Sequence, residues 1–464
     1  MTVLAVVGIA STASCNRGGP GHAQQARASK EERVEPATTG SERIRSLIER
    51  LRSQDESTRR AAMDELRQLG KGEGFSLSEG VQLLRATTLE FSGNTPGLWD
   101  TPTWMIAAVA DEPRREYLPI IKELFPRWGI SARERALDLL SGIDDAAAAE
   151  TFMQLLRENA SEISSPPLMR LQRQPHHPEV FFPGLLELVK HEAIANDVYL
   201  TTLNFCQEGL LPPDKLAGYA APFQDAYRRE RDWLRPKQRD KGAGWMWEED
   251  YQEHRNRAAL LLDLFSCLSI ETVEFDLRDA TSFRDARLAY FGAVSLLKHG
   301  KGVSADALKA VAASPEMRGS LYEELKKTHK IDLFPRRYLT QEAFAESEMV
   351  RWLVYPTELG RVPDEIELMK VVSADTREPD GILDYYVFRF RTFKPHWAAK
   401  DGWTAGVAGP FLRKDAPSPD AYGGTFSSFE RWEAQTPEQH VGDIRALLEE
   451  WATHRAKEQN ATKQ

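Results

Sequence analysis

Cysteine is scarce in this sequence, with three residues in a chain of 464. That scarcity excludes a small disulfide-stapled scaffold and a Cys-rich zinc or iron–sulfur module. Basic residues are not in excess either, because 60 Lys and Arg stand against 70 Asp and Glu and leave a formal charge of −10. A nucleic-acid binder usually carries a basic face or a basic excess, so we expect no nucleic-acid partner.

The apolar run near the N-terminus is too short to cross a membrane. Val3–Ala10, within MTVLAVVGIASTASC, falls far below the roughly 20 residues that a spanning helix needs, but it suits the core of a signal peptide. The small residues Ala13 and Ser14 precede Cys15, and TASC resembles the lipobox of bacterial lipoproteins. The resemblance implies lipid attachment at Cys15 and an envelope location. A plain secretory signal and a cytosolic chain are the alternatives.

The motifs of several well-known sites are missing. At Gly300-Lys301 a phosphate-binding loop would need an earlier glycine and a following hydroxyl, but Ser295 and Gly302 occupy those positions. We found no dinucleotide fingerprint, zincin helix or nucleophile elbow. We therefore expect no catalytic residues and no cofactor.

Beyond the signal segment 1–15, composition separates a polar linker from a helical region. Residues 16–40 are rich in Gly, Ala, Gln, Ser and charge and lack apolar periodicity, which predicts a flexible tether. From residue 41 apolar residues recur at helical spacing, as in Ile44, Leu47, Ile48 and Leu51. The helical region is expected to extend to residue 355.

One helix in this region carries a family resemblance. SQDESTRRAAMDELRQLG (53–70) has an acidic cap at Asp55, an arginine, paired alanines and a final Leu-Gly, and its helix is predicted to stop at Gly70, a natural C-cap residue. It resembles the second helix of HEAT-like repeats, which implies an α-solenoid; an irregular all-α domain is the alternative. Similar helices are predicted to start near residues 131, 195 and 282. The first two intervals each leave room for one further helix pair.

The pattern changes to strands in residues 356–464. Alternating apolar segments predict an antiparallel sheet followed by an amphipathic helix, with strands at 365–373, 384–393, 402–411 and 423–432 and the helix at 440–456. Tyr386, Phe388 and Phe390 share one strand face and are expected to face the core, because Arg389 and Arg391 lie on the other. The final helix is the expected cover of the aromatic face. The predicted fold is thus mainly α, with a small α+β C-terminal domain.

Two groups of basic and aromatic residues are candidate binding surfaces. The first is a basic loop in which Trp245 and Trp247 follow Arg235, Lys237, Arg239 and Lys241. The second, near the Gly-rich strand, comprises Arg389, Arg391, His396, Trp397 and Trp403. Such groups bind anions, sugars or partners, but anchoring a loop or filling a small core is the simpler interpretation of the tryptophans.

Three other features are interpreted as structural. His176-His177 lies in a Pro-flanked loop with Glu179 nearby and could bind a transition metal, but a polar loop pair is the simpler interpretation, so we expect no metal. A charged helical segment contains Glu249, Asp250, Glu253, His254, Arg255 and Arg257. Its carboxylates and histidine could serve as acid and base or as ligands, but the arginines favour an exposed face with salt bridges. Cys206 and Cys267 lie in apolar stretches and are interpreted as buried small hydrophobes, although an exported chain allows a disulfide between them.

These features together favour a non-enzymatic interaction scaffold tethered to the bacterial envelope. Stacked helix pairs expose extended faces for binding, and the sequence shows no convergent catalytic set. The expected contacts are an unidentified protein partner and, through the lipid on Cys15, the membrane. The alternative is an enzyme or small-ligand-binding protein with its site in the C-terminal domain.

Overall fold

The computed structural model describes residues 42–461, except 73, 93–99, 164–167, 239–243, 355–358, 376–380, 393–401, 417–424 and 427–429. The predicted signal segment and linker, with Cys15, therefore lie outside the described residues. The described chain is mainly α-helical and ends in a small antiparallel sheet with a final helix, as the sequence predicts.

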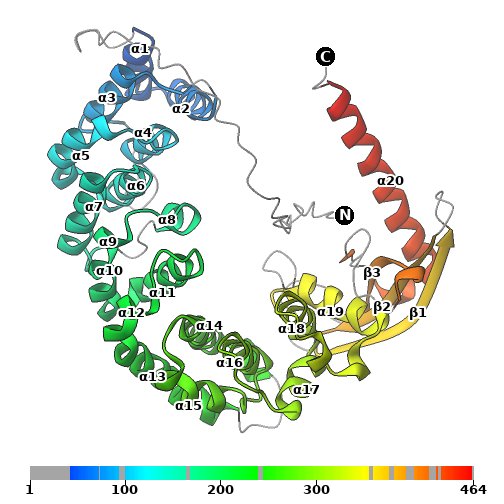
Figure 1. The fold of residues 1–464 in the computed structure, drawn as a ribbon. Coiled ribbons are helices and arrows are strands. Elements are labelled where there is room, and N and C mark those ends of the chain that lie inside the picture. Colours follow the sequence, from blue (N-terminus) through cyan, green and yellow to red (C-terminus); the bar gives the residue numbers. More distant parts are fainter. Residues whose placement is uncertain are drawn as a thin grey trace, which may run out of the picture.

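Helices α1 to α18 stack in two layers that curve into an arc (Figure 1). The outer layer contains α1 (Glu42–Leu51), α3 (Leu77–Ala86), α5 (Leu118–Leu124), α7 (Ala146–Glu158), α9 (Pro178–Phe181), α10 (Gly184–Glu187), α12 (Pro213–Leu216), α13 (Ala220–Lys237), α15 (Ile270–Ala280) and α17 (Ala305–Ala313). The inner layer contains α2 (Glu56–Lys71), α4 (Thr101–Ala110), α6 (Ile130–Ser141), α8 (Met169–Arg173), α11 (Glu192–Gln207), α14 (Glu249–Leu264), α16 (Ala286–Lys298) and α18 (Pro315–Lys327). Each inner helix contacts the next one along the chain, which is a helical-repeat arrangement of the α-solenoid type.

The helices predicted to be second members of repeats all lie in the inner layer. They correspond to α2, α6, α11 and α16, and the inner helices α4, α8 and α14 stand between them. The first two intervals thus contain one further helix pair each, as the spacing predicts. The helices that share this sequence pattern therefore share one layer of the arc.

The start of α2 is capped as the sequence predicts, but the helix ends at a different residue. Asp55 accepts a hydrogen bond from the backbone N–H of Thr58 at 2.8 Å, which caps the first turn. The helix does not stop at Gly70, because it continues to Lys71. Gly70 instead faces α4, where an added Cβ would lie 3.2 Å from the carbonyl oxygen of Ala108. This glycine therefore permits a close helix approach rather than a helix end.

The C-terminal sheet has four strands in the order β1-β2-β3-β4, and all neighbouring strands are antiparallel. The strands match the four predicted segments: β1 (Glu365–Asp375), β2 (Ile382–Arg391), β3 (Thr404–Leu412) and β4 (Thr425–Phe426). The final helix is α20 (Pro437–Ala461). Among the described residues, no helix has the length and the hydropathy that a membrane span requires.

The aromatic face of β2 is buried as predicted, but a different helix covers it. Tyr386, Phe388 and Phe390 are each at most 7% exposed. They pack against α19 (Gln341–Val354), through Ala345, Met349 and Leu353. The expectation that the final helix covers these aromatics is therefore wrong.

Helix α20 covers the opposite face of the sheet. Its Val441 and Ile444 pack on Tyr385, Val387 and Val407. Val387 is fully buried although it shares its face with two arginines, because those arginines lie at the end of the strand beyond the helix contact. The sheet is thus a middle layer between two helices, and one of them lies before residue 355, where the sequence suggests a boundary.

Candidate functional site

The structure brings together three of the predicted binding residues at the end of the sheet. Arg389 and Arg391 lie at the end of β2, and Trp403 directly precedes β3. The Cζ atoms of Arg389 and Arg391 lie 4.3 and 4.5 Å from the centre of the Trp403 ring, within cation–π range. The backbone N–H of Trp432 donates to the Trp403 carbonyl oxygen at 2.8 Å and holds the start of β3.

Both arginines are already paired with carboxylates on β1. Arg389 Nε lies 2.8 Å from Glu367 Oε2, and Arg391 Nε lies 2.5 Å from Glu365 Oε2. The hydrogen bond from Arg391 lowers the pKa of the Glu365 carboxyl. An anionic ligand at this surface would have to displace these carboxylates, so the arrangement favours a structural role for the pair.

Two of the other predicted binding residues, Trp245 and Trp247, lie elsewhere in the fold. His396 and Trp397 lie outside the described residues. Trp245 and Trp247 belong to the 3₁₀ helix η5 (Gly244–Trp247) in front of α14. Trp245 is 7% exposed and contacts the ring of Tyr251 at 4.8 Å, so it anchors the loop to the core.

Trp247 joins the solenoid to the segment before the sheet. The guanidinium carbons of Arg255 and Arg361 each lie 5.8 Å from the centre of its ring. Arg255 belongs to α14, whereas Arg361 lies between α19 and β1. The tryptophan is therefore engaged by two cations of the chain itself.

Arg255 forms a buried ion-pair network where the sequence predicts an exposed face. It is 1% exposed, its Nε lies 2.9 Å from Asp285 Oδ2, and its Nη2 contacts both oxygens of Glu316 at 2.9 Å. Burial opposes its charge, but Asp285 and Glu316 outweigh that effect and raise the pKa of Arg255. Tyr251 donates to Asp285 at 3.0 Å, and burial raises the pKa of that phenol. The partners lie on other helices, so the local sequence gave no signal of this site.

A second polar network in α14 has the composition of an acid–base pair. His254 Nδ1 lies 2.5 Å from Glu230 Oε2, and the imidazole stacks on Trp233 at 3.9 Å. The other oxygen of Glu230 accepts from Arg257 at 3.1 Å. In the described part of the chain His254 makes no hydrogen bond to a hydroxyl or thiol, so no nucleophile completes the pair.

The two core cysteines contact each other as free thiols. Cys206 lies in α11, and Cys267 lies in the 3₁₀ helix η6 (Phe265–Cys267). Their hydrogen bond raises the pKa of the Cys206 thiol and lowers that of the Cys267 thiol. Both are half-buried against the main core, in line with their apolar sequence surroundings.

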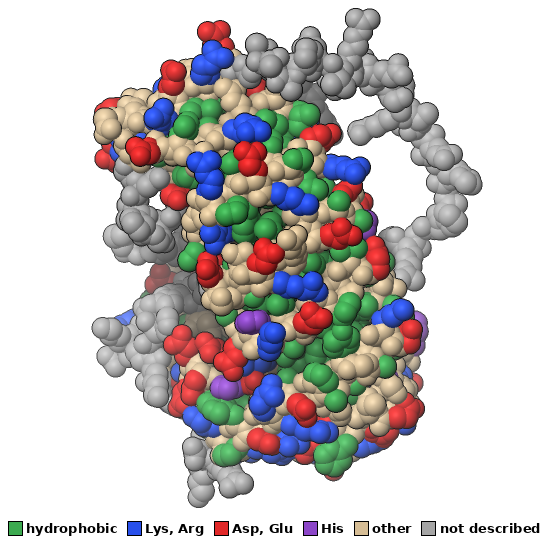
Figure 2. Space-filling view, turned by 90° about the vertical axis from the view of Figure 1, so that its left-hand side faces the viewer, with side chains coloured by type: hydrophobic (Ala, Val, Ile, Leu, Met, Phe, Trp, Pro, Cys, Tyr) green, Lys and Arg blue, Asp and Glu red, His purple; other side chains and the backbone are tan. Residues whose placement is uncertain are grey.

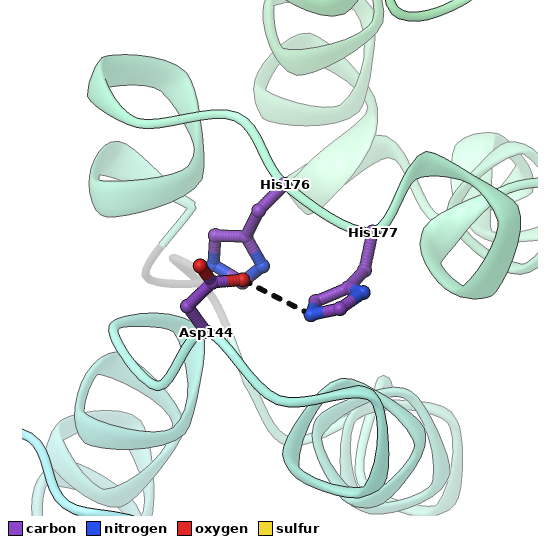
Figure 3. Close-up of side chains that lie close together, drawn as sticks. All are labelled: Asp144, His176 and His177. Carbon is purple, nitrogen blue, oxygen red and sulfur yellow. Dashed lines mark ion pairs between the residues drawn. The ribbon is translucent and has the colours of Figure 1, made fainter.

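A third cluster joins two loops of the arc (Figure 3). Asp144 precedes α7, and His176 and His177 lie between α8 and α9. One ligand atom from each of these side chains lies within 4.8 Å of the others. The sequence singled out the histidine pair but missed Asp144, because nothing in the local pattern links the two loops.

The exposed side of α2 forms an open, polar surface. Two shallow hollows lie along it, and the larger has a volume of about 570 Å³. Their lining comprises Asp55, Glu56, Ser57, Arg60, Ala61, Asp64, Arg67, Gln68 and Lys71. An open polar surface suits contacts with a macromolecule, whereas a small molecule usually binds in an enclosed pocket.

No protein-family model matches this chain, and no curated protein matches it either. The functional assignment therefore rests on the residues and geometry described above.

Proposed function

We propose that this protein is a HEAT-like interaction scaffold without catalytic activity, held at the bacterial envelope by a lipid on Cys15. Its partner is a protein that binds along the inner layer of the arc. The main support for this proposal is that the inner helices from α2 to α18 contact one another in an unbroken series. Together they form one extended surface. Solenoid proteins use such surfaces to bind macromolecules.

The distribution of polar groups supports this proposal over the enzyme alternative. The candidate groups of the C-terminal sheet, Arg389 and Arg391, already have carboxylate partners. The exposed side of α2 carries several charged groups in wide solvent contact, such as Arg60 and Glu56, whose side chains are about three-quarters exposed. Figure 2 shows the outer layer, where charges of both signs alternate with apolar side chains and no single-sign field develops.

Photo-crosslinking tests the binding surface. A benzoylphenylalanine in place of Arg60, in the inner layer, is expected to give adducts of defined mass in intact cells. The same replacement at Lys122, an exposed residue of the outer helix α5, is the control and should give none. Adducts from the outer position alone, or from neither position, would contradict the scaffold proposal.

Replacing Cys15 with serine is expected to move the protein from the membrane fraction to the soluble fraction. Serine lacks the thiol that takes the diacylglycerol, so labelling with a radioactive fatty acid should disappear as well. Cys206→Ser is the matched control, because it removes a thiol of the core and should leave partitioning unchanged. An intact Met1 in the mature protein, by mass spectrometry, would exclude the lipoprotein assignment.

A further inference from the structure

We propose that Asp144, His176 and His177 bind a Zn²⁺ ion that joins two neighbouring loops of the arc. The two histidines come from the loop between α8 and α9, and the aspartate comes from the loop between α6 and α7 (Figure 3). The side chains converge between the helices, and Asp144 and His177 point toward each other. This inference is independent of the scaffold function.

His176 is oriented as a metal ligand. Its Nε2 lies 3.0 Å from the carbonyl oxygen of Ser141, which places the proton on Nε2 and leaves the lone pair on Nδ1. The ring also packs edge-to-face on the fully buried Phe181 at 5.7 Å. Nδ1 is buried and has no hydrogen-bond partner, a situation that a native structure usually avoids.

His177 is held in the same way by a different acceptor. Its Nδ1 lies 3.3 Å from Glu179 Oε1, so this edge carries the proton and the lone pair is on Nε2. Nε2 lies 3.1 Å from Asp144 Oδ1 but makes no directed hydrogen bond to it. A carboxylate that orients a histidine from behind is typical of metal sites.

The backbone conformation of His177 also supports a ligand-binding role. The residue has φ 46° and ψ 49°, in the left-handed region that a non-glycine residue seldom adopts. This conformation turns His177 beside His176, with the two ring centres 5.2 Å apart. Strained backbone of this kind concentrates at ligand-binding positions.

The donor set selects the metal. Two imidazoles and one carboxylate suit Zn²⁺ and similar transition metals, whereas Mg²⁺ and Ca²⁺ prefer oxygen ligands. Zinc bonds of about 2.0–2.2 Å in a tetrahedron place ligand atoms roughly 3.3–3.6 Å apart, and the three ligand atoms here already lie within 4.8 Å of one another. The Asp144 side chain is 82% exposed and is free to rotate inward. The fourth position is left for water.

An ion pair between protonated His177 and Asp144 is the competing explanation. It accounts for the 3.1 Å contact but leaves the buried Nδ1 of His176 without a partner. A shared cation accounts for all three side chains at once. Because its ligands come from two loops, the ion would link consecutive helix pairs of the solenoid.

Isothermal titration of the full-length, chelator-treated chain with Zn²⁺ tests the proposal. We expect one Zn²⁺ per chain at micromolar affinity or better, with no Mg²⁺ binding at the same concentrations. In His177→Asn, asparagine tolerates the left-handed backbone but removes the imidazole, so affinity should fall at least about 100-fold. His329→Asn is the matched control, since His329 also has a positive φ, of 56°, and is not part of this cluster. It should bind Zn²⁺ like the wild type.

Two further measurements separate this site from the thiols. Zn²⁺ should raise the melting temperature of the wild type and of His329→Asn but not that of His177→Asn. The Co²⁺-loaded protein should show visible d–d bands without the near-ultraviolet charge-transfer band of a thiolate ligand. No binding to the wild type, equal affinity in the two variants, or a thiolate band from Cys206 or Cys267 would overturn the proposal.

Discussion

Arg255→Ala is expected to lower the free energy of unfolding by about 3–5 kcal/mol, the range for removing one partner of a buried ion pair. The side chain of Arg255 is 2% exposed and that of Asp285 is fully buried, so alanine would leave a carboxylate without its cation. Asp285 also caps α16, because its Oδ1 accepts from the backbone N–H of Arg287 at 2.9 Å. Chemical denaturation followed by the helical circular dichroism signal measures the effect.

Arg278→Ala is the matched control for this experiment. Arg278 pairs with Glu274 one helical turn away, and its side chain is 51% exposed. Exposed pairs of this kind contribute less than about 1 kcal/mol, so the variant should behave nearly like the wild type. Equal losses in the two variants would show that the Arg255 network is not buried in solution.

A second test separates the charge from the volume. Arg255→Met combined with Asp285→Asn and Glu316→Gln removes all three charges and keeps side chains of similar size. The amide oxygen introduced by Asp285→Asn would still accept the capping hydrogen bond at α16. We expect this triple variant to regain much of the stability lost in Arg255→Ala, because no uncompensated charge remains. If the triple variant is no more stable than Arg255→Ala, the loss of stability comes from packing and not from an unpaired charge.

Phe388→Ala is expected to destabilise the C-terminal sheet by roughly 3–5 kcal/mol, the range for emptying a buried aromatic site. Phe388 is 2% exposed and lies between the sheet and α19, where Met349 and Leu353 belong to the same core. The measurement is hydrogen exchange of the β2 amides in the full chain, because α19 belongs to this core and a fragment starting at residue 356 would lack it. Faster exchange should be confined to the sheet and α19.

Arg389→Ala is the neighbouring control on the same strand. Its side chain is 28% exposed and pairs with Glu367, whose side chain is 47% exposed, so its loss should cost less than about 1 kcal/mol. Greater damage from Arg389→Ala than from Phe388→Ala would mean that the strand faces are assigned the wrong way round.

The elements of the fold were predictable because their signals are local. Helical spacing of apolar residues found α2, α6, α11 and α16, and alternation found the strands, since both periods depend only on backbone geometry. The cap at Asp55 was predictable for the same reason, because donor and acceptor lie within one turn. The glycine at position 70 was misread, because its role depends on Ala108 of another helix.

By itself, the sequence determined which segments are helix or strand, and that Tyr386, Phe388 and Phe390 form a buried face of β2. Only the tertiary structure decided which helix covers each sheet face, since both α19 and α20 offer suitable apolar residues. Only in the tertiary structure is Arg255 buried between Asp285 and Glu316, and only there does Asp144 lie beside His176 and His177. The physical reason is that periodicity reports a residue's own burial in its element, whereas pairing between distant charges depends on how separate helices and loops meet.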